Sequence, residues 1–559
     1  MKNMIKISFL YLLTVLIITV PWFLRDGYLF FTDFVYGPNI KLDLVSPWFL
    51  FNLLVKSLSI VFSIAFLQKI FIASIFILIL FGGRILIKTI LEYYNKQKDT
   101  ISSRGLIFIL SLFALFNPFV YDRALYGQFG ILIAYGCLFF ITTYLFKTWQ
   151  TLDFKKLYLV AIFSAIALMF SAHFIFLMLP FYLLFLIGIF IKRQEIKTSN
   201  LFRKFKFSVL FSIIIILVIN ANWLIAVFIN SSPLNNFFQK EVTPQDLIAF
   251  STAGKTSMET VTNVLMMSGF WGKDQLRYLD LTDATGWQRG FILLLPIILY
   301  GVYLSLRKNT RQNKIFSFSL LVVFIIAVLL AVGIKAPIVR GLTTFLYEHL
   351  PLYKGLREPQ KWVAVIIPIY LFYLTLGVSG LTKFRIIIKN KVLSGIILSV
   401  IIVMLAPSLL WGFNRQVKPT MYPNDWLEVN NLLLSKSSQS KSCSDRILFL
   451  PWHLYMSFDW AGKIIANPAP NFFPCPVLSG TNMEYGGIYD NSGNFNSDAI
   501  MDWLKLKGEG GMPTLIGESV RYVILAKEVD FKSYLWLNDL SYLQLIKETE
   551  NLFVYEVRY

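Results

Sequence analysis

The stretch KRQEIKTSNLFRKFK, residues 192–206, decides the topology of this chain. It holds six Lys or Arg residues and one acidic residue, and it separates two long apolar runs, residues 174–191 and 207–229. Short loops rich in Lys and Arg stay in the cytoplasm when the neighbouring segments cross a membrane. The stretch therefore predicts a cytoplasmic loop between two membrane-spanning helices.

The same charge pattern recurs on both sides of this stretch. Basic gaps occupy every second interval between apolar runs, at residues 84–104, 147–156, 307–314 and 383–391. The intervening gaps, and everything after residue 411, are then expected outside the cytoplasm, with the N-terminus inside. The candidate chemistry consequently lies on the outer face of the plasma membrane.

The composition also indicates a multi-pass membrane protein. The chain is 56% hydrophobic and 15% charged, with a mean hydropathy of +0.62. Its net charge of +20 does not indicate nucleic-acid binding, because the excess sits in the cytoplasmic gaps, where it sets topology and attracts anionic membrane lipids. No basic and aromatic platform for nucleic acid accompanies it.

A helix needs about 20 predominantly apolar residues to cross a bilayer, and about eleven stretches approach this criterion. They lie near residues 5–24, 70–87, 106–116, 129–146, 157–170, 174–191, 207–229, 290–306, 315–333, 362–380 and 392–411. The first run has no small-residue cleavage pattern after it and is interpreted as a retained anchor. An odd number of crossings places the C-terminus outside.

A further apolar segment, residues 44–67, carries Lys56 at its middle. If it crossed the membrane, every later basic gap would face outward, so it is interpreted as a helix lying along the outer interface. The predicted membrane domain is residues 1–411, with external loops at 25–69, 230–288 and 336–361. Residues 412–559 form the second domain.

This second domain has the composition of a soluble α/β or α+β domain and is expected outside the cell. A helix is predicted at residues 426–434, and strands at 446–450, 521–525, 542–547 and 552–557. Cys443 and Cys475 both fall here, where a disulfide is chemically permitted, but their spacing does not establish one. Cys137 lies inside a predicted span and is interpreted as core.

The predicted spans carry essentially no ionisable side chain, apart from His173 at a span boundary. Ion-coupled transporters need such groups near the middle of the bilayer. Polar residues instead collect at the outer helix ends. This arrangement favours an enzyme whose substrate is held in lipid and whose chemistry occurs at the interface.

Three short motifs resemble a known group of membrane enzymes. YLFFTD at residues 28–33, PLYKGLREPQKW at 351–362, and the tail segments 520–525 and 550–556 are similar to the GT-C superfamily of membrane glycosyltransferases. Within it, they resemble YfhO-type and arabinofuranosyltransferase-like proteins. The chain has Thr32-Asp33-Phe34 and no adjacent acidic pair, which disfavours a metal-bridging role; no metal ligand is assigned, and a divalent cation remains an open alternative as cofactor.

The resemblance implies transfer of a sugar from a polyprenyl-phosphate donor to a glycan, lipid or protein acceptor outside the membrane. The acceptor hydroxyl needs a base, and Asp33 is the candidate. Asp26 and Asp43 in the same loop are alternatives. Asp33 is otherwise a solvated loop acid or a cap for the segment that follows.

The departing lipid phosphate needs cations nearby. Arg357 and Lys361 are the leading candidates, with Arg123 behind them, whereas a structural pairing of Arg357 with Glu358 is the alternative. Asp122, His173 and Glu358 are expected in the substrate pocket. Asp122 with Arg123 could equally be a local ion pair, and His173 a polar residue at a helix end.

The predicted function is therefore a polytopic GT-C-like glycosyltransferase. One alternative is a non-catalytic scaffold or lipid-linked glycan handling protein with the same fold. Another is a flippase or transporter.

Overall fold

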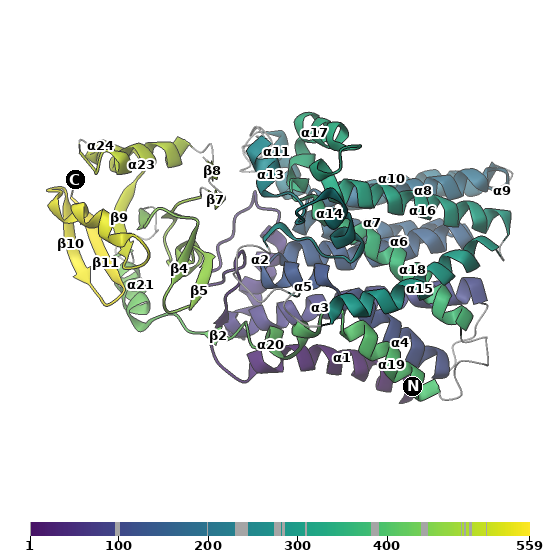
Figure 1. Ribbon diagram of the computed structural model, residues 1–559. Coiled ribbons are helices and arrows are strands. Elements are labelled where there is room, and N and C mark those ends of the chain that lie inside the picture. The colour runs from purple at the N-terminus through teal and green to yellow at the C-terminus, as the bar shows by residue number, and fades with distance from the viewer. Residues whose placement is uncertain are drawn as a thin grey trace.

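The computed structural model describes residues 2–95, 101–197, 200–229, 244–272, 281, 286–307, 310–381, 391–437, 445–481, 483–485, 488–490, 495–509 and 511–558. Most of its helices lie side by side in one bundle (Figure 1). The C-terminal domain sits at one end of this bundle, and the N-terminus lies at the other end (Figure 1). The two termini are thus separated by the length of the bundle.

Among the residues that the structure describes, six helices are long and apolar enough to cross a membrane, judged by length and composition. They contain α3 (Ile64–Asn95), α6 (Phe129–Thr151), α8 (Phe174–Ile191), α15 (Trp287–Arg307), α16 (Arg311–Val332) and α18 (Val363–Leu381). The most buried of them begins just before α18, and 94% of its apolar window is buried. This polytopic helical architecture confirms the predicted fold class.

Three further helix pairs meet the same criterion together, but each is bent. They are α4 (Ile101–Leu115) with α5 (Pro118–Leu125), bent by 50°, α10 (Leu201–Ile219) with α11 (Ala221–Phe228), bent by 79°, and α19 (Lys391–Val403) with the segment ending in α20 (Leu410–Asn414), bent by 81°. These nine match nine of the predicted crossings. The other two correspond to α1 (Lys2–Phe23) and the 14-residue α7 (Leu157–Phe170), and the total of eleven stays a prediction.

The bend between α4 and α5 follows from its sequence, Asn117-Pro118. The Asn117 side chain accepts a hydrogen bond from the N–H of Val120 at 3.0 Å, and it donates to the carbonyl of Phe113 at 3.1 Å. It therefore caps α5 while closing α4. Pro118 occupies the first position of α5, where its missing N–H costs nothing. The result is a short helix set across the end of the bundle.

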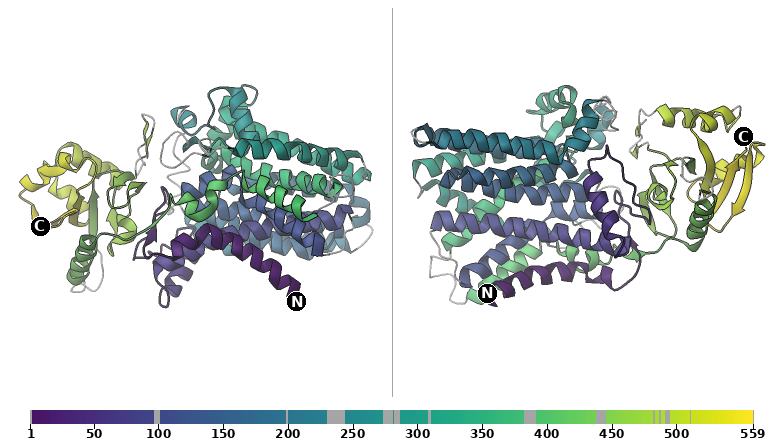
Figure 2. Two further views of the ribbon diagram at one scale, coloured as in Figure 1. Left: turned by 60° about the horizontal axis from the view of Figure 1, so that its bottom comes forward. Right: turned by 180° about the vertical axis from the view of Figure 1, so that it is seen from behind.

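The predicted interfacial helix at residues 44–67 is shorter than expected. The structure has a separate helix, α2 (Phe49–Leu58), at the end of the bundle that faces the C-terminal domain (Figure 2). The hydroxyl of Ser59 bonds the carbonyl of Lys56 at 2.7 Å where α2 ends. The hydroxyl of Ser63 accepts from the N–H of Phe66 where α3 begins. Two serines that compete for backbone hydrogen bonds thus divide the apolar run.

Shorter helices cover the same end of the bundle. They include α13 (Pro244–Ala249), α14 (Ser257–Leu265) and α17 (Arg340–His349), followed by 3-10 turns at Pro351–Leu356 and Pro359–Trp362. At the opposite end, α9 (Arg193–Lys197) lies in the basic stretch between α8 and α10 (Figure 1). The basic stretch at residues 192–206 is therefore at the end of the bundle opposite these shorter helices.

The C-terminal domain is built on a five-stranded sheet in the order β10-β11-β9-β3-β6. Its strands are β3 (Arg446–Leu450), β6 (Val477–Leu478), β9 (Val520–Ala526), β10 (Leu543–Glu548) and β11 (Leu552–Val557). The neighbours β9, β3 and β6 are parallel, and β9, β11 and β10 are antiparallel. All four predicted strands are confirmed.

The predicted helix is also present, as α21 (Asn424–Ser437), and α23 (Phe495–Lys505) and α24 (Met512–Gly517) complete the helices beside the sheet. A separate hairpin joins β4 (Tyr455–Phe458) to β5 (Lys463–Ala466). Cys475 is disulfide-bonded. Cys443, for which the sequence permitted a disulfide with Cys475 without establishing it, lies outside the described residues, whereas Cys137 is free and buried, as expected of a core residue.

The first external segment belongs to both domains. Its strand β1 (Tyr28–Leu29) pairs antiparallel with β2 (Pro419–Thr420), and Phe30 and Val35 lie in the core of the C-terminal domain. The side chain of Gln68 in α3 bonds both the N–H and the carbonyl of Leu29, at 2.8 and 2.7 Å. The division at residue 411 is therefore incomplete, because a piece of the predicted loop 25–69 is packed into the second domain.

Candidate functional site

A cavity of about 490 Å³ is lined by the first external segment and by the segments around the starts of α6, α8 and α18. Its polar lining comes from the first external segment, the start of α6, the turn between α7 and α8, and the segment before α18. Its polar side chains include Asp33, Gln128, His173, Glu358 and Lys361. Four residues predicted for the site, Asp33, His173, Glu358 and Lys361, thus come together from distant parts of the sequence.

Asp33 is an exposed carboxylate on this cavity. The side-chain amide of Gln128 donates a hydrogen bond to Asp33 Oδ2 at 3.2 Å, and the hydroxyl of Tyr455 donates to Oδ1 at 2.7 Å. The backbone N–H of Asp33 donates to the carbonyl of Tyr126 at 2.8 Å. The carboxylate is accordingly held in place while it remains open to solvent.

Gly127 allows the Asp33 segment to approach the start of α6. Its φ is +83°, which favours glycine, and a Cβ there would lie 2.8 Å from Phe31 Cβ and from the N of Phe34. Any larger residue would push the first external segment away. The position of Asp33 therefore depends on a glycine almost 100 residues later in the chain.

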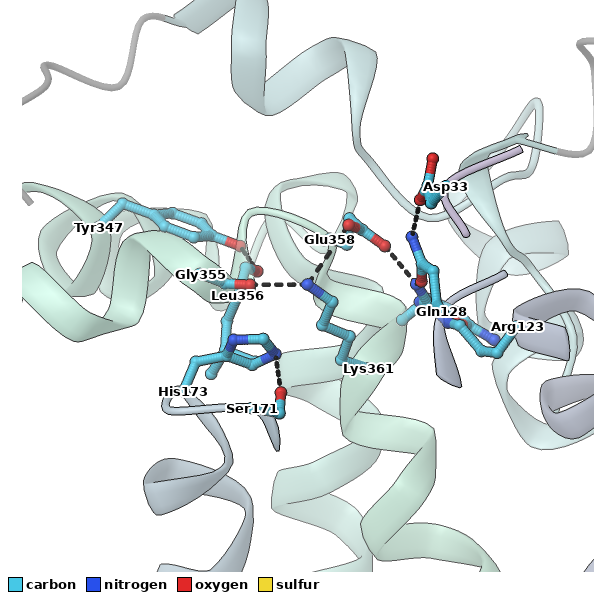
Figure 3. Close-up of polar contacts among 11 residues, drawn as sticks. Asp33, Arg123, Gln128, Ser171, His173, Tyr347, Gly355, Leu356, Glu358 and Lys361 are labelled. Carbon is cyan, nitrogen blue, oxygen red and sulfur yellow. Dashed lines mark hydrogen bonds and ion pairs between the residues drawn. The ribbon is translucent and has the colours of Figure 1, made fainter. Parts of the chain in front are cut away.

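A buried ionic cluster lies beside Asp33 (Figure 3). Glu358 pairs with the guanidinium of Arg123 and, at 3.3 Å, with Lys361 Nζ. Arg123 also donates to Gln128 and, at 2.6 Å, to Gln360 Oε1. Arg123 is fully buried and Lys361 is 5% exposed. Hydrogen bonds thus run continuously from Lys361 through Glu358, Arg123 and Gln128 to Asp33.

This cluster has a net charge of +1, from two cations and one carboxylate. Burial alone would raise the pKa of Glu358, but Lys361 and Arg123 outweigh it and hold that pKa well below its usual range. Glu358 is therefore ionised and fully committed to its two cations. A small excess of positive charge remains next to the cavity.

His173 lines the cavity near Lys361 (Figure 3). Burial, with the positive charge of Lys361, keeps the pKa of His173 well below its usual value, so the ring is neutral. Its Nε2 lies 3.1 Å from Ser171 Oγ. A Cβ on Gly355 would lie 2.8 Å from the Cβ of His173. The absence of a side chain at Gly355 thus lets the histidine fit against the loop before α18.

That loop is held by hydrogen bonds to its own carbonyls. Lys361 Nζ donates to the carbonyl of Gly355 at 2.8 Å, and the hydroxyl of Tyr347 in α17 donates to the carbonyl of Leu356. The turn therefore presents Glu358 and Lys361 on the cavity side of the bundle.

The other three predicted residues are not among those that line the cavity. Arg123 lies behind Gln128, as the cluster shows, and Asp122 is buried beside it in α5. The guanidinium of Arg357 lies over the ring of Phe250, 4.4 Å from its centre. Phe250 belongs, with Tyr126, Phe270 and Trp271, to an aromatic cluster over α5. Arg357 is not among the residues that line the cavity, and its contact with a donor phosphate stays a prediction.

Sequence reasoning missed Gln128, Gln360 and Tyr455. Gln128 immediately precedes a predicted span and Gln360 lies inside the quoted motif at 351–362, so their positions at outer helix ends were a usable signal. Tyr455 gave none, because it is 422 residues from Asp33 in the sequence.

A metal site was left open by the sequence. Among the residues that the structure describes, no group of three or more His, Cys, Asp or Glu side chains could hold a metal ion. The apolar lining of the cavity includes Phe34, Trp48, Phe129, Phe170 and Leu352. The site therefore combines one exposed carboxylate, one buried cationic cluster and an aromatic wall.

No protein-family model matches the sequence, and no curated protein matches it. Solved structures do resemble the fold. Arabinofuranosyltransferase AftD from Mycobacteria aligns with a TM-score of 0.57 at 12% identity, over 99% of this chain and 40% of that one. A single-residue variant of AftD gives a TM-score of 0.58 at 12% identity, over 99% and 41%.

The apo structure of ArnT from Cupriavidus metallidurans aligns over 98% of this chain and 97% of that one, with a TM-score of 0.39 at 10% identity. The chain spans about two fifths of the length of the AftD chains that it matches. The likeness to AftD shows that this chain shares the fold of that protein, as the resemblance of the sequence motifs predicted.

Proposed function

We propose that this GT-C-fold membrane protein is a glycosyltransferase that moves a sugar from a polyprenyl-phosphate donor to a glycan, lipid or protein acceptor outside the cytoplasm. The observation that carries the proposal is the meeting of Asp33 and Lys361 on one cavity. An acceptor-activating base and a phosphate-binding cation are the two groups that such a transfer requires.

Asp33 acts as the base. Its carboxylate accepts the proton of the acceptor hydroxyl while the acceptor oxygen forms a bond to the anomeric carbon. The bond from that carbon to the phosphate oxygen breaks, and polyprenyl phosphate leaves with the electron pair. Glu358 is unsuited to this role, because it is buried and paired with Arg123 and Lys361.

Lys361 binds the departing phosphate. Its ammonium has three donors, and two of them have acceptors among the described residues, the carbonyl of Gly355 and the carboxylate of Glu358. Arg123 stands behind Glu358 and keeps the cluster cationic. A positive group fixed before the reaction stabilises charge that develops on the leaving group.

The apolar wall receives the lipid part of the donor. Trp48 and Phe170 pack edge to face with ring centres 4.7 Å apart, and Trp48 directly precedes α2 at the bundle end. Phe34 and Phe129 extend the same wall. Apolar chain atoms next to a cationic phosphate site match the two halves of a polyprenyl phosphate.

The test is transfer by purified protein with a panel of polyprenyl-phosphate sugars. Asp33→Asn should lower the rate by about two to four orders of magnitude, because it removes the base. Asp43→Asn is the matched control: Asp43 is in the same segment, is exposed, bonds the N–H of Val45 and is not among the residues lining the cavity. It should keep the wild-type rate.

The alternatives give different results. Transfer that is unchanged by Asp33→Asn removes Asp33 from the reaction, and a wild type that transfers no sugar from any donor contradicts the proposal and favours the scaffold. Translocation of the carrier lipid without transfer favours a flippase.

A further inference from the structure

Tyr455 of the C-terminal domain reaches the carboxylate that the membrane domain presents. Its hydroxyl donates a hydrogen bond to Asp33 Oδ1 at 2.7 Å. Tyr455 lies on β4, in the hairpin β4–β5, and its side chain is partly exposed. The C-terminal domain therefore supplies a polar contact inside the site described above.

Backbone hydrogen bonds fix the register of this contact. Ala466 of β5 is the cross-strand partner of Tyr455, and its N–H donates to the carbonyl of Thr32 at 2.8 Å. The N–H of the next residue, Asp33, donates to Tyr126 in the membrane domain, also at 2.8 Å. The hairpin is thus docked on the residue before Asp33, and the bundle holds Asp33 itself.

The two carboxylate oxygens are held from different domains. Gln128, from the start of α6, donates to Oδ2, and Tyr455 donates to Oδ1. Gln128 is itself held by the buried Arg123. A carboxylate bonded at both oxygens has a fixed plane, and a base acts well only when it is oriented toward the proton that it accepts.

We propose that Tyr455 is a positioning residue for sugar transfer, which orients the Asp33 carboxylate and makes the C-terminal domain part of the active centre. The inference rests on the proposed function. It assigns the C-terminal domain a role beyond covering the bundle, since that domain donates the hydrogen bond to Oδ1 of the Asp33 carboxylate.

The test is Tyr455→Phe, which removes one hydroxyl and keeps the ring. The rate constant kcat should fall about 10- to 100-fold, as expected for loss of a hydrogen bond to a charged group. KM for the donor should stay within about twofold and the melting temperature should not change, because the donor-binding Lys361 and the domain core are untouched. A residue with only a structural role would shift the melting temperature instead.

Tyr542→Phe is the matched control. Tyr542 lies in the same domain, and its hydroxyl donates to the carbonyl of Gly508 at 2.6 Å and accepts from Trp503. Tyr542→Phe also removes a tyrosine hydroxyl that donates a hydrogen bond, but Tyr542 is not among the residues that line the cavity. Its kcat should equal that of the wild type.

A double variant gives a second readout. Gln128→Leu removes the hydrogen bond to Asp33 Oδ2. Because Gln128 and Tyr455 both act through one carboxylate, the loss of kcat in the double variant should be clearly smaller than the product of the losses in the two single variants. Multiplicative losses, or a wild-type kcat for Tyr455→Phe in an enzyme that still needs Asp33, would overturn this inference alone. A wild type without transferase activity would overturn the proposed function and the inference together.

Discussion

The two walls of the cavity differ in how they hold charge. On one wall, Glu358 and Lys361 are buried within the membrane domain with Arg123 behind them, and the three charges sum to +1. On the other, Asp33 is exposed and is held by hydrogen bonds from two domains. Under the proposed function, the buried wall binds the phosphate of the donor and the carboxylate on the exposed wall accepts the proton of the acceptor.

This contrast predicts that charge substitutions have their largest effect on stability at the buried wall. Glu358→Gln leaves Arg123 and Lys361 as buried cations without a carboxylate, which should cost about 3 to 5 kcal/mol of folding free energy. Thermal unfolding of the purified protein measures this loss. The control is Glu428→Gln, because Glu428 pairs with Lys547 at 2.9 Å on the surface and such pairs contribute at most about 1 kcal/mol.

Equal melting temperatures for Glu358→Gln and Glu428→Gln would contradict this prediction, since the buried cluster would then contribute no more stability than a surface ion pair.

The ammonium of Lys361 on the buried wall should stabilise the departing phosphate of the donor. Lys361→Gln removes the ammonium and keeps a hydrogen-bonding side chain, so kcat/KM for the polyprenyl-phosphate donor should fall about 10- to 100-fold. Steady-state kinetics with varied donor measure the change. Lys354→Gln, in the same loop but not among the residues lining the cavity, should leave kcat/KM near the wild-type value; an equal loss in both variants would point to the loop and not to the ammonium.

The packing of His173 against the loop before α18 can be tested at Gly355. Gly355→Ala places a methyl group 2.8 Å from His173 Cβ, and overpacking of this kind costs about 1 to 3 kcal/mol. The melting temperature should fall accordingly. Gly341→Ala in α17 is the control, because a Cβ there meets nothing within 4 Å and alanine favours a helix. A stable Gly355→Ala protein would show that the histidine moves aside freely.

The smallest effect is expected at the opposite end of the bundle. Lys204 is exposed in α10, and Lys204→Gln should change the folding free energy by less than about 0.5 kcal/mol. Chemical denaturation measures this difference. A loss as large as that of Glu358→Gln would mean that the basic end also contains a tightly coupled cluster.

Much of the bundle could be predicted because membrane crossing imposes a length and a composition on each helix. The charge rule alone placed the basic stretch at residues 192–206 and the intervening gaps that hold the candidate site residues at opposite ends. The α2 prediction was too long because apolar content does not reveal a break. That break depends on Ser59 and Ser63, whose hydroxyls bond the backbone locally.

Part of the site was also predictable. His173, Glu358 and Lys361 lie at or just before helix starts on one side of the bundle, and Asp33 lies in the segment that follows the first helix, so all four meet at that end. The orientation of Arg357 toward Phe250 and the approach of Tyr455 depend on how loops and domains pack. Those contacts join segments with no shared sequence pattern, so no local rule predicts them.

The pairing of β1 with β2 has a consequence for biosynthesis. Strand β1 follows α1 directly, but its partner strand β2 is made almost 400 residues later, because Tyr28 pairs with Thr420. Close by, the indole of Trp22 in α1 donates to the carbonyl of Val417, 395 positions later. Closing so long a loop is slow compared with forming a helix. A chain that stops before residue 420 has an Asp33 segment without its β-strand partner, so the arrangement around Asp33 should form only after β2 has been synthesised.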